Sequence, residues 1–390
     1  MKSKRNGPAK LYGEVDHPKA GKTRSPVKKF NSSIKKKMMF RKDMFLKMIA
    51  LAMFVAVLLG ACAPAAEVAE PEVAEPEVAE PEVRGKGSGL PCQPNCQYSD
   101  LVVGFLQTGS EGGWRAANTA SFNETAEQVG LTLKFYDSQN ALDKQVAGFQ
   151  QFIEDPDVNV IILSALETTG WDQLIKDAYA AGKIVVIQDR RIDAPADLFE
   201  TFIGADFVEE GRKSAREICA LLEGSESKKV WELTGNVGSS AEKDRGQGFR
   251  EAMTECGLEV TKSQTANWSI TEGKQVTEAW LKETTDVQAI FGQNDEMALG
   301  AIEALKEAGL EPGVDVKVLS VDATAGAFNA MLDGTLNVTV ECNPLLAPQV
   351  YEAALKAANG EVLPEWIPSQ EDVFRATDPN LQEIAEGRKY

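Results

Sequence analysis

The chain has 390 residues, of which 43% are hydrophobic and 26% charged, and these values are typical of globular chains with two or three domains. Its formal net charge is −18, but residues 1–62 carry 15 basic and 3 acidic side chains, whereas the remainder carries 26 and 56. So acidic a body repels phosphates, which argues against nucleic acid as a partner. The single histidine, His17, lies in the basic segment. This excludes Ser-His-Asp and Cys-His catalysis and histidine metal sites from the body.

The N-terminal region predicts export. Residues 48–62 are uncharged and follow six basic residues between positions 35 and 47, which is the pattern of a secretory signal. The run is too short to span a membrane comfortably. Leu59-Gly60-Ala61-Cys62 resembles a bacterial lipobox. That resemblance implies cleavage before Cys62 and lipid on its sulfur, which would hold the protein on the outer face of the cytoplasmic membrane, in a periplasm or at a cell surface.

Two further features flank this signal. Residues 1–37 are long and polar for the start of a signal peptide, so we expect translation to begin at Met38, Met39 or Met44. Residues 63–98 form an expected linker, in which AEPEV occurs three times between Ala69 and Val83. Prolines and like charges favour an extended chain of about 3.1 Å per residue, so we interpret this stretch as a spacer.

The cysteines outside the signal leave alternatives open. Cys92 and Cys96 could form a small disulfide or half of a metal site, and the absence of a second pair or a nearby histidine favours the disulfide. Cys219 could pair with Cys256, or both could be buried thiols like Cys342.

From Asp100 onward, apolar β-branched stretches alternate with amphipathic ones, which predicts parallel sheets covered by helices on both faces. The first expected strands are 101–105, 131–136, 158–163 and 184–187, with helices at 113–129, 141–153 and 170–181. After a crossing at 200–204, strands are expected at 229–233, 259–262, 289–291, 316–321 and 336–340, with helices at 209–222, 241–254, 272–282, 296–308 and 325–332. We therefore expect an α/β chain with two doubly wound lobes and a ligand cleft at the carboxyl ends of the strands.

Polar and aromatic side chains gather at those predicted strand ends. The candidate binding residues are Trp114, Arg115, Asp189, Arg190, Arg245, Trp268, Asn294 and Asp322, with Glu341 as a further candidate. Carboxylates, amides and guanidinium groups match sugar hydroxyls, and indole rings pack on the apolar faces of sugar rings. Each residue also has a structural alternative: a core tryptophan, a helix or loop cap at Asn294 or Asp322, or a surface ion pair at Arg245. Their shared placement favours a site for a polyhydroxy ligand.

Several separate motifs resemble one family. The stretches 293–300 (QNDEMALG), 189–190 (DR) and 244–249 (DRGQGF) resemble periplasmic sugar-binding proteins of ABC importers, of the ribose type. Residues 109–117, 169–171 and 388–390 are most similar to galactofuranose-binding proteins. The likeness runs from about Ser99 to Tyr390. It implies the type I periplasmic binding protein fold, whose three hinge crossings would lie near Gly204, Val340 and Glu371. The first lobe would then be 99–204 plus 341–370, including a helix around Pro348–Ala358, and the second lobe 205–340 plus 371–390.

The resemblance also implies roles. Trp114 and Trp268 would stack on the sugar ring, and Arg115, Asp189, Arg190, Arg245, Asn294 and Asp322 would bind hydroxyls. Glu341 falls near a glutamine of the ribose binders. Arg115 replaces an aromatic residue of those proteins, which favours a larger or more polar sugar.

We therefore expect a monomer without cofactor, metal or catalytic residues, which delivers a monosaccharide to a membrane permease with separate ATPase subunits. One rival is a secreted glycoside hydrolase that pairs Asp189 with Asp322 or Glu341. The strand-end arginines would keep those acids ionised and leave no proton donor. The other rival is a sensor that uses the same trap and docks on a receptor.

Overall fold

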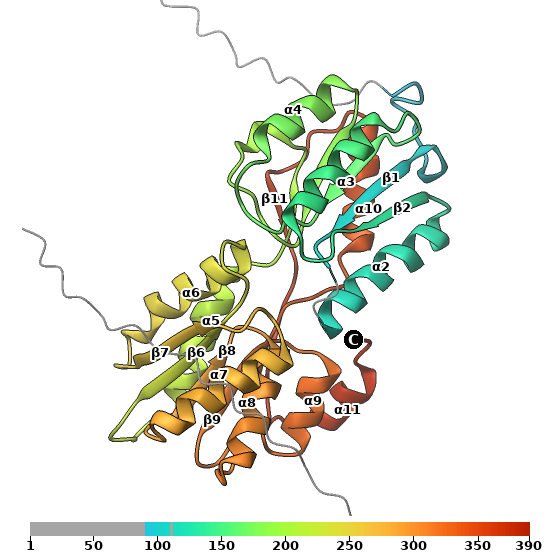
Figure 1. The fold of residues 1–390 in the computed structure, drawn as a ribbon. Helices are drawn as coiled ribbons and strands as arrows, with labels where there is room; N and C mark the ends of the chain where they lie inside the picture. Colours follow the sequence, from blue (N-terminus) through green and yellow to red (C-terminus); the bar gives the residue numbers. More distant parts are fainter. Residues whose placement is uncertain (1–89, 110–111) are drawn as a thin grey trace, which may run out of the picture. The chain divides into compact units, whose positions relative to one another are not determined.

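A computed structural model describes residues 90–109 and 112–390 (Figure 1). The expected signal, the lipid site at Cys62 and most of the repeat linker lie outside the described residues. No helix in the described part of the chain is both long and apolar enough to cross a membrane.

The described chain forms two six-stranded sheets, each covered by helices (Figure 1). The first sheet, in the order β11-β5-β4-β3-β1-β2, is parallel throughout. Its strands are β1 (Val102–Gln107), β2 (Thr132–Asp137), β3 (Val160–Leu163), β4 (Ile184–Gln188), β5 (Phe202–Gly204) and β11 (Trp366–Pro368). Its helices are α2 (Gly113–Val129), α3 (Leu142–Glu154), α4 (Asp172–Ala180) and α10 (Ala347–Ala358). These elements are called the first lobe.

The second sheet has the order β12-β10-β9-β8-β6-β7, and only β12 runs antiparallel to its neighbour. Its strands are β6 (Lys229–Thr234), β7 (Glu259–Thr265), β8 (Ala289–Gly292), β9 (Lys317–Asp322), β10 (Val338–Glu341) and β12 (Val373–Arg375). Its helices are α5 (Phe207–Leu221), α6 (Ser240–Met253), α7 (Ile270–Glu283), α8 (Asp295–Glu307), α9 (Ala325–Leu332) and α11 (Leu381–Gly387). These elements are called the second lobe.

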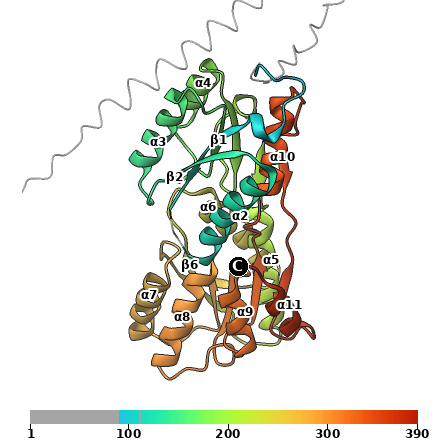
Figure 2. The same ribbon diagram turned by 90° about the vertical axis from the view of Figure 1, so that its right-hand side faces the viewer.

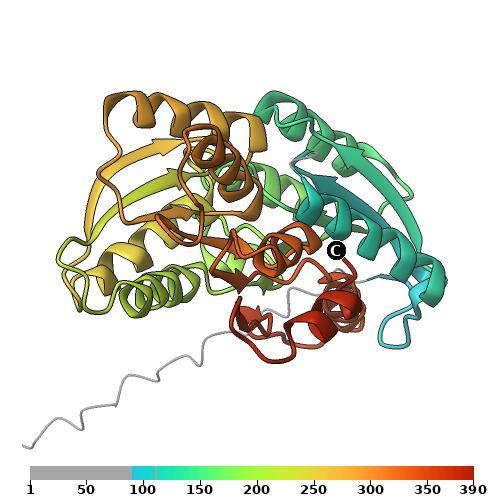
Figure 3. The same cartoon turned by 90° about the horizontal axis from the view of Figure 1, so that it is seen from below.

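The chain passes between the two sheets three times. It leaves the first lobe after β5, returns after β10 and leaves again between β11 and β12. The red C-terminal segments therefore run along both groups of elements in the view from below (Figure 3). This arrangement is the expected fold: two parallel-sheet α/β lobes joined by three crossings.

Apolar strands explain the cores. The strands β3 and β4 are buried at every position, as expected for central strands with helices on both faces. The helix α10 lies beside α2 (Figure 2) and adds Val350, Tyr351 and Ala354 to an apolar cluster with Phe105 and Phe122. The first lobe's core therefore depends on a helix that the chain reaches only after it has built the second lobe's parallel strands.

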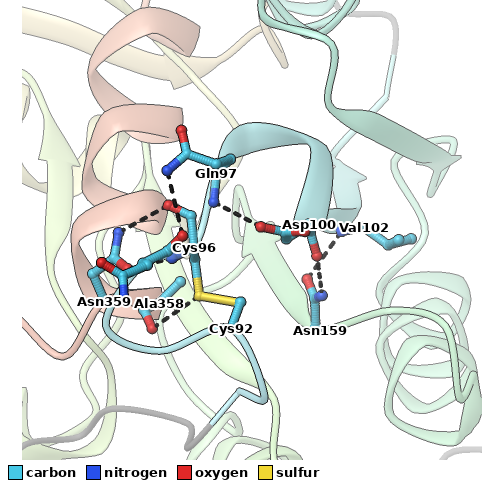
Figure 4. Close-up of a disulfide and its surroundings, with 9 residues drawn as sticks. Cys92, Cys96, Gln97, Asp100, Val102, Asn159, Ala358 and Asn359 are labelled. Carbon is cyan, nitrogen blue, oxygen red and sulfur yellow. Dashed lines mark hydrogen bonds between the residues drawn. A yellow bond between two sulfur atoms is a disulfide. The ribbon is translucent and has the colours of Figure 1, made fainter.

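The chain entering the first lobe is fastened to the end of α10 (Figure 4). Cys92 and Cys96 form a disulfide, which confirms the favoured pairing. The backbone N–H of Cys96 donates to Oδ1 of Asn359 at 2.7 Å, and Nδ2 of Asn359 donates to the carbonyl oxygen of Cys96 at 3.2 Å. Cys219 and Cys256 also form a disulfide, while Cys342 is a buried free thiol.

Candidate functional site

A small cavity of about 40 Å³ lies where residues of both lobes meet. Eight of the nine sequence-predicted residues line it. The full lining is Trp114, Arg115, Asp189, Arg190, Phe207, Ala241, Arg245, Trp268, Asn294, Glu296, Asp322 and Cys342. The expected gathering of strand-end side chains is therefore present as a single cavity.

The first lobe supplies an aromatic ring beside a buried ion pair. Trp114 and Arg115 lie in the first turn of α2, and Asp189 follows β4. Nη1 of Arg115 lies 2.7 Å from Oδ2 of Asp189, and the Ser164 hydroxyl donates to the same oxygen at 2.8 Å. Nε1 of Trp114 donates to the carbonyl oxygen of Cys342 at 2.6 Å. These bonds fix the orientation of the ring and of both charged groups in the cavity.

The second lobe supplies a matching arginine. Arg245, within α6, donates from Nε to Oε2 of Glu210 at 2.6 Å, and its Nη2 lies 3.5 Å from Oδ1 of Asp322 at the end of β9. Its Nη1 donates to the carbonyl oxygen of Gln293 at 2.7 Å. Burial lowers the pKa of Arg245, but the charges of Glu210 and Asp322 outweigh that effect and leave the pKa raised. The guanidinium group therefore stays charged. The alternative of an exposed surface pair is wrong for Arg245.

Trp268 and Asn294 complete the second lobe's side of the cavity. The carbon Cζ of Arg190 and that of Arg245 each lie 5.7 Å from the ring centroid of Trp268, so two cations flank the indole. The indole Nε1 of Trp268 is buried and has no acceptor among the described residues. Asn294 is the N-cap of α8, since its Oδ1 accepts from the N–H of Met297 at 3.0 Å. Asn294 thus has both the capping role and the cavity position.

Three lining residues have left-handed backbone conformations. The φ angles are 62° at Asp189, 60° at Trp268 and 121° at Asp322, a region that residues other than glycine seldom occupy. Such conformations concentrate at functional sites, because the surrounding structure must hold them in place.

At Asp322, the effect of burial on the pKa runs against the expected effect of the neighbouring arginine. Burial raises the pKa of Asp322 well above its ordinary value, and the opposing effect of Arg245 is smaller. Asp295, behind it, also has a raised pKa because of burial, although Ser320, Thr324 and Thr339 donate hydrogen bonds to its carboxylate. The direction of these shifts therefore removes the argument, based on the strand-end arginines, against a glycoside hydrolase.

Glu341 is not among the residues that line this cavity. It ends β10 and lines a separate pocket with the C-terminal segment. Its Oε1 accepts from Nη1 of Arg388 at 2.6 Å and from the hydroxyl of Tyr390 at 2.8 Å. The carboxylate is thus engaged in fixing the C-terminal segment to the end of β10.

Sequence reasoning missed four lining residues: Phe207, Ala241, Glu296 and Cys342. Glu296 stands within the QNDEMALG motif, and Cys342 directly follows a strand end, so both carried a positional signal. Phe207 and Ala241 did not, because apolar residues in the first turns of helices are common in any core.

One group of described residues has the composition of a metal site. Ligand atoms of Glu210, Cys342 and Glu371 lie within 4.8 Å of one another. Arg245 already provides a positive charge to Glu210, and the pKa of the Cys342 thiol is raised by burial. Both features disfavour a cation there, because metal ligation requires a thiolate and an unpaired carboxylate.

Comparisons with known proteins point to one family. The family described as "Periplasmic binding protein domain" matches residues 103–361. The galactofuranose-binding protein YtfQ of Escherichia coli is 33% identical over 289 residues, which are 73% of this chain and 90% of that protein.

Two solved structures are similar in fold and sequence. One, from Mycobacterium smegmatis in complex with β-D-fucofuranose, has a TM-score of 0.69 and 39% identity, and covers 74% of this chain and 97% of that one. The other is the binding protein of the arabinose ABC transporter from Shewanella sp. ANA-3, bound to α- and β-L-arabinofuranose. It has a TM-score of 0.71 and 36% identity, and covers 74% of this chain and 96% of that one.

Proposed function

Because the chain belongs to the periplasmic binding protein domain family, we propose that it captures a monosaccharide in the cavity between its lobes and delivers it to an ABC permease. The observation that carries this proposal is the composition of the cavity. Two indole rings, three guanidinium groups and three carboxyl groups, from Asp189, Glu296 and Asp322, converge there, near the carboxyl ends of parallel strands.

The chemistry of these groups suits a polyhydroxy ligand. Hydroxyls both donate and accept hydrogen bonds, so they can satisfy carboxylates and guanidinium groups at once. The buried Nε1 of Trp268 offers one more donor without an acceptor among the described residues. The names of the relatives favour a furanose: galactofuranose, fucofuranose and arabinofuranose are bound by the three proteins reported above. We propose a furanose form of galactose or a related sugar as the ligand.

Capture would proceed by closure. The sugar binds one lobe, the three crossings bend, and the second lobe adds its contacts and excludes water. Closure is then driven by the contacts that exist only in the closed form. No step requires bond breaking, so we propose a binding protein without enzymatic activity, and the raised pKa of Asp322 reflects burial rather than acid catalysis.

The remaining parts of the proposal concern location and assembly. We propose export, a lipid anchor on Cys62, a spacer of residues 63–91, which ends before the Cys92–Cys96 disulfide, and a monomeric mature protein. A bound sugar would then be presented to a permease at the same membrane. Mass spectrometry of the membrane fraction tests the anchor, since the mature N-terminus should be an acylated Cys62.

The central test is calorimetry of residues 90–390 against galactose, ribose, xylose, arabinose, glucose and a furanose-rich galactose preparation. We expect a tight response to a furanose-containing sample. Asp189→Asn should weaken it roughly 10- to 100-fold, because a hydrogen bond to a buried charge contributes about 1.5–3 kcal/mol. Asp172→Asn, at an exposed position of α4, is the matched control. Silence across the panel, or turnover of a glycoside, would refute the proposal.

A further inference from the structure

Glu296 connects the two lobes directly. It lies in the first turn of α8 in the second lobe, and its Oε1 accepts a hydrogen bond of 2.7 Å from the backbone N–H of Gly113. Gly113 is the first residue of α2 in the first lobe. The contact therefore exists only while the two lobes are closed on each other.

The contact supplies what the start of α2 lacks. The helices α5, α6, α7 and α8 each begin with a side-chain cap, from Asp206, Ser239, Ser269 and Asn294. The N-cap of α2 is Gly112, which has no side chain to serve as a cap. The first N–H groups of a helix need acceptors from outside it, and a negative charge is favourable there because of the helix dipole.

The backbone at Gly112 is shaped for this approach. Its φ angle is 133°, and a Cβ atom there would lie 2.1 Å from Oε1 of Glu296. Only glycine leaves room for the carboxylate, so the fit between the two lobes is specific at this point.

Both partners of this hydrogen bond lie next to residues that line the cavity. The second oxygen of Glu296, Oε2, accepts from Nδ2 of Asn294 at 2.9 Å, and Asn294 lines the cavity. On the other side, Trp114 and Arg115 follow Gly113 in the same turn of α2. Ligand contacts on either lobe thus hold the two partners of the hydrogen bond in position.

We propose that Glu296 is a positioning residue that caps α2 from the opposite lobe and thereby slows reopening of the closed, sugar-loaded protein. This rests on the proposed function. A contact between the lobes that lacks this link to the site serves for comparison: Nζ of Lys243 donates to Oγ1 of Thr168 at 2.8 Å, and neither residue lines the cavity. The Glu296 carboxylate couples closure to occupancy, whereas the Lys243 contact only adds to closure.

The test separates association from dissociation. Trp114 and Trp268 line the cavity, so stopped-flow tryptophan fluorescence with the furanose-rich galactose preparation should report both rates. Glu296→Gln keeps the size and shape of the side chain but replaces one carboxylate oxygen with an NH2 group. Both oxygens of Glu296 accept hydrogen bonds, so one of these two bonds is lost whichever way the amide is oriented. We expect the dissociation rate to rise about tenfold or more, with association changed by less than about twofold, because a charge-assisted hydrogen bond is lost only on opening. Glu303→Gln, exposed on the same helix, is the control and should match the wild type.

A second variant approaches the contact from the other lobe. Gly113→Pro removes the donor at the first helical position, where proline is well tolerated. It should raise the dissociation rate, and the double variant should be less impaired than the two single effects combined predict. Thermal unfolding of each sugar-free variant checks that the lobes remain folded.

The outcomes are distinct. An unchanged dissociation rate in Glu296→Gln would overturn the proposed role of Glu296. Additive effects in the double variant would also overturn it, because they would indicate that Glu296 acts on the ligand directly and not through Gly113. No binding by the wild-type protein would instead overturn the proposed function.

Discussion

Glu371, where the chain crosses between the lobes, lies beside a second glutamate, Glu210. This environment favours the protonated form of Glu371. Glu210 of α5 and Glu371, between β11 and β12, lie close together with the thiol of Cys342. Arg245 neutralises Glu210, while Glu371 accepts hydrogen bonds from Oγ of Ser369 and the N–H of Asn343. Burial raises the pKa of Glu371 to about 9, and the charge of Glu210 adds to the effect.

The sign of the resulting pH dependence follows from proton linkage. An unfolded glutamate has a pKa of about 4.3, so between that value and about 9 the folded protein holds a proton on Glu371 that the unfolded chain does not. Stability from this group is fully present below pH about 4.3 and is lost as the pH rises through about 9. The slope in this window is about 1.4 kcal/mol per pH unit.

Glu371→Gln isolates this contribution. Glutamine cannot lose a proton, and its amide can donate to Glu210 as the protonated acid does. As the pH rises from 6 to 8, we expect the unfolding free energy of the variant to increase relative to that of the wild type by about 1.4 kcal/mol per pH unit.

The assay is urea denaturation at several pH values, with a chelator present so that no cation replaces the proton. Glu361→Gln, at an exposed position, controls for the loss of one charge. A difference between the Glu371→Gln variant and wild type that stays constant with pH would show that Glu371 is ionised in the folded protein, and would refute the reasoning.

Three further predictions test the second lobe and the closed form. Replacing both Cys219 and Cys256 with serine should lower the unfolding free energy by about 4 kcal/mol, because the disulfide closes a loop with a sequence separation of 37; calorimetric unfolding measures this, and a loss below about 1 kcal/mol would contradict it. Arg245→Met should cost about 3–5 kcal/mol in denaturant, since it leaves Glu210 buried without its cation, whereas Arg375→Ala, which breaks a more exposed ion pair, should cost about 1 kcal/mol or less. Equal costs would refute that comparison. Gly112→Ala should weaken sugar affinity at least about tenfold in calorimetry, since both φ and Glu296 oppose a Cβ; unchanged affinity would show that the closed form does not need this approach.

Most of the fold was predictable because its signal is local. The helix predicted at 113–129 is observed with these bounds, and it ends at Gly130, which adopts the left-handed conformation that glycine favours at the ends of helices. The strands β11 and β12 were not predicted as strands. Each has three residues and only partial burial, so neither shows an apolar alternation. Their pairing is set by the sheets that they join at the edges.

The site was predictable where a residue follows a buried strand. Asp189, Asn294 and Asp322 stand at or just beyond strand ends, so the rule for parallel sheets found them. Glu341 satisfies the same rule yet lies outside the cavity, because Arg388 and Tyr390 fold back onto it from a C-terminal segment whose path no local pattern reveals. The bond between Glu296 and Gly113 spans 183 positions and depends on how the lobes meet.

The position of α10 has a consequence for biosynthesis. Tyr351 of this helix donates to the carbonyl oxygen of Phe122 and packs against its ring, yet 229 positions separate them. As the chain leaves the ribosome, β1, β3 and β4 must wait until α10 is made before their apolar surface can be fully covered. Such distant contacts slow folding and leave nascent intermediates to chaperones. For the export proposed above, that delay would keep the first lobe unfolded, and so able to cross a membrane, until synthesis is almost finished.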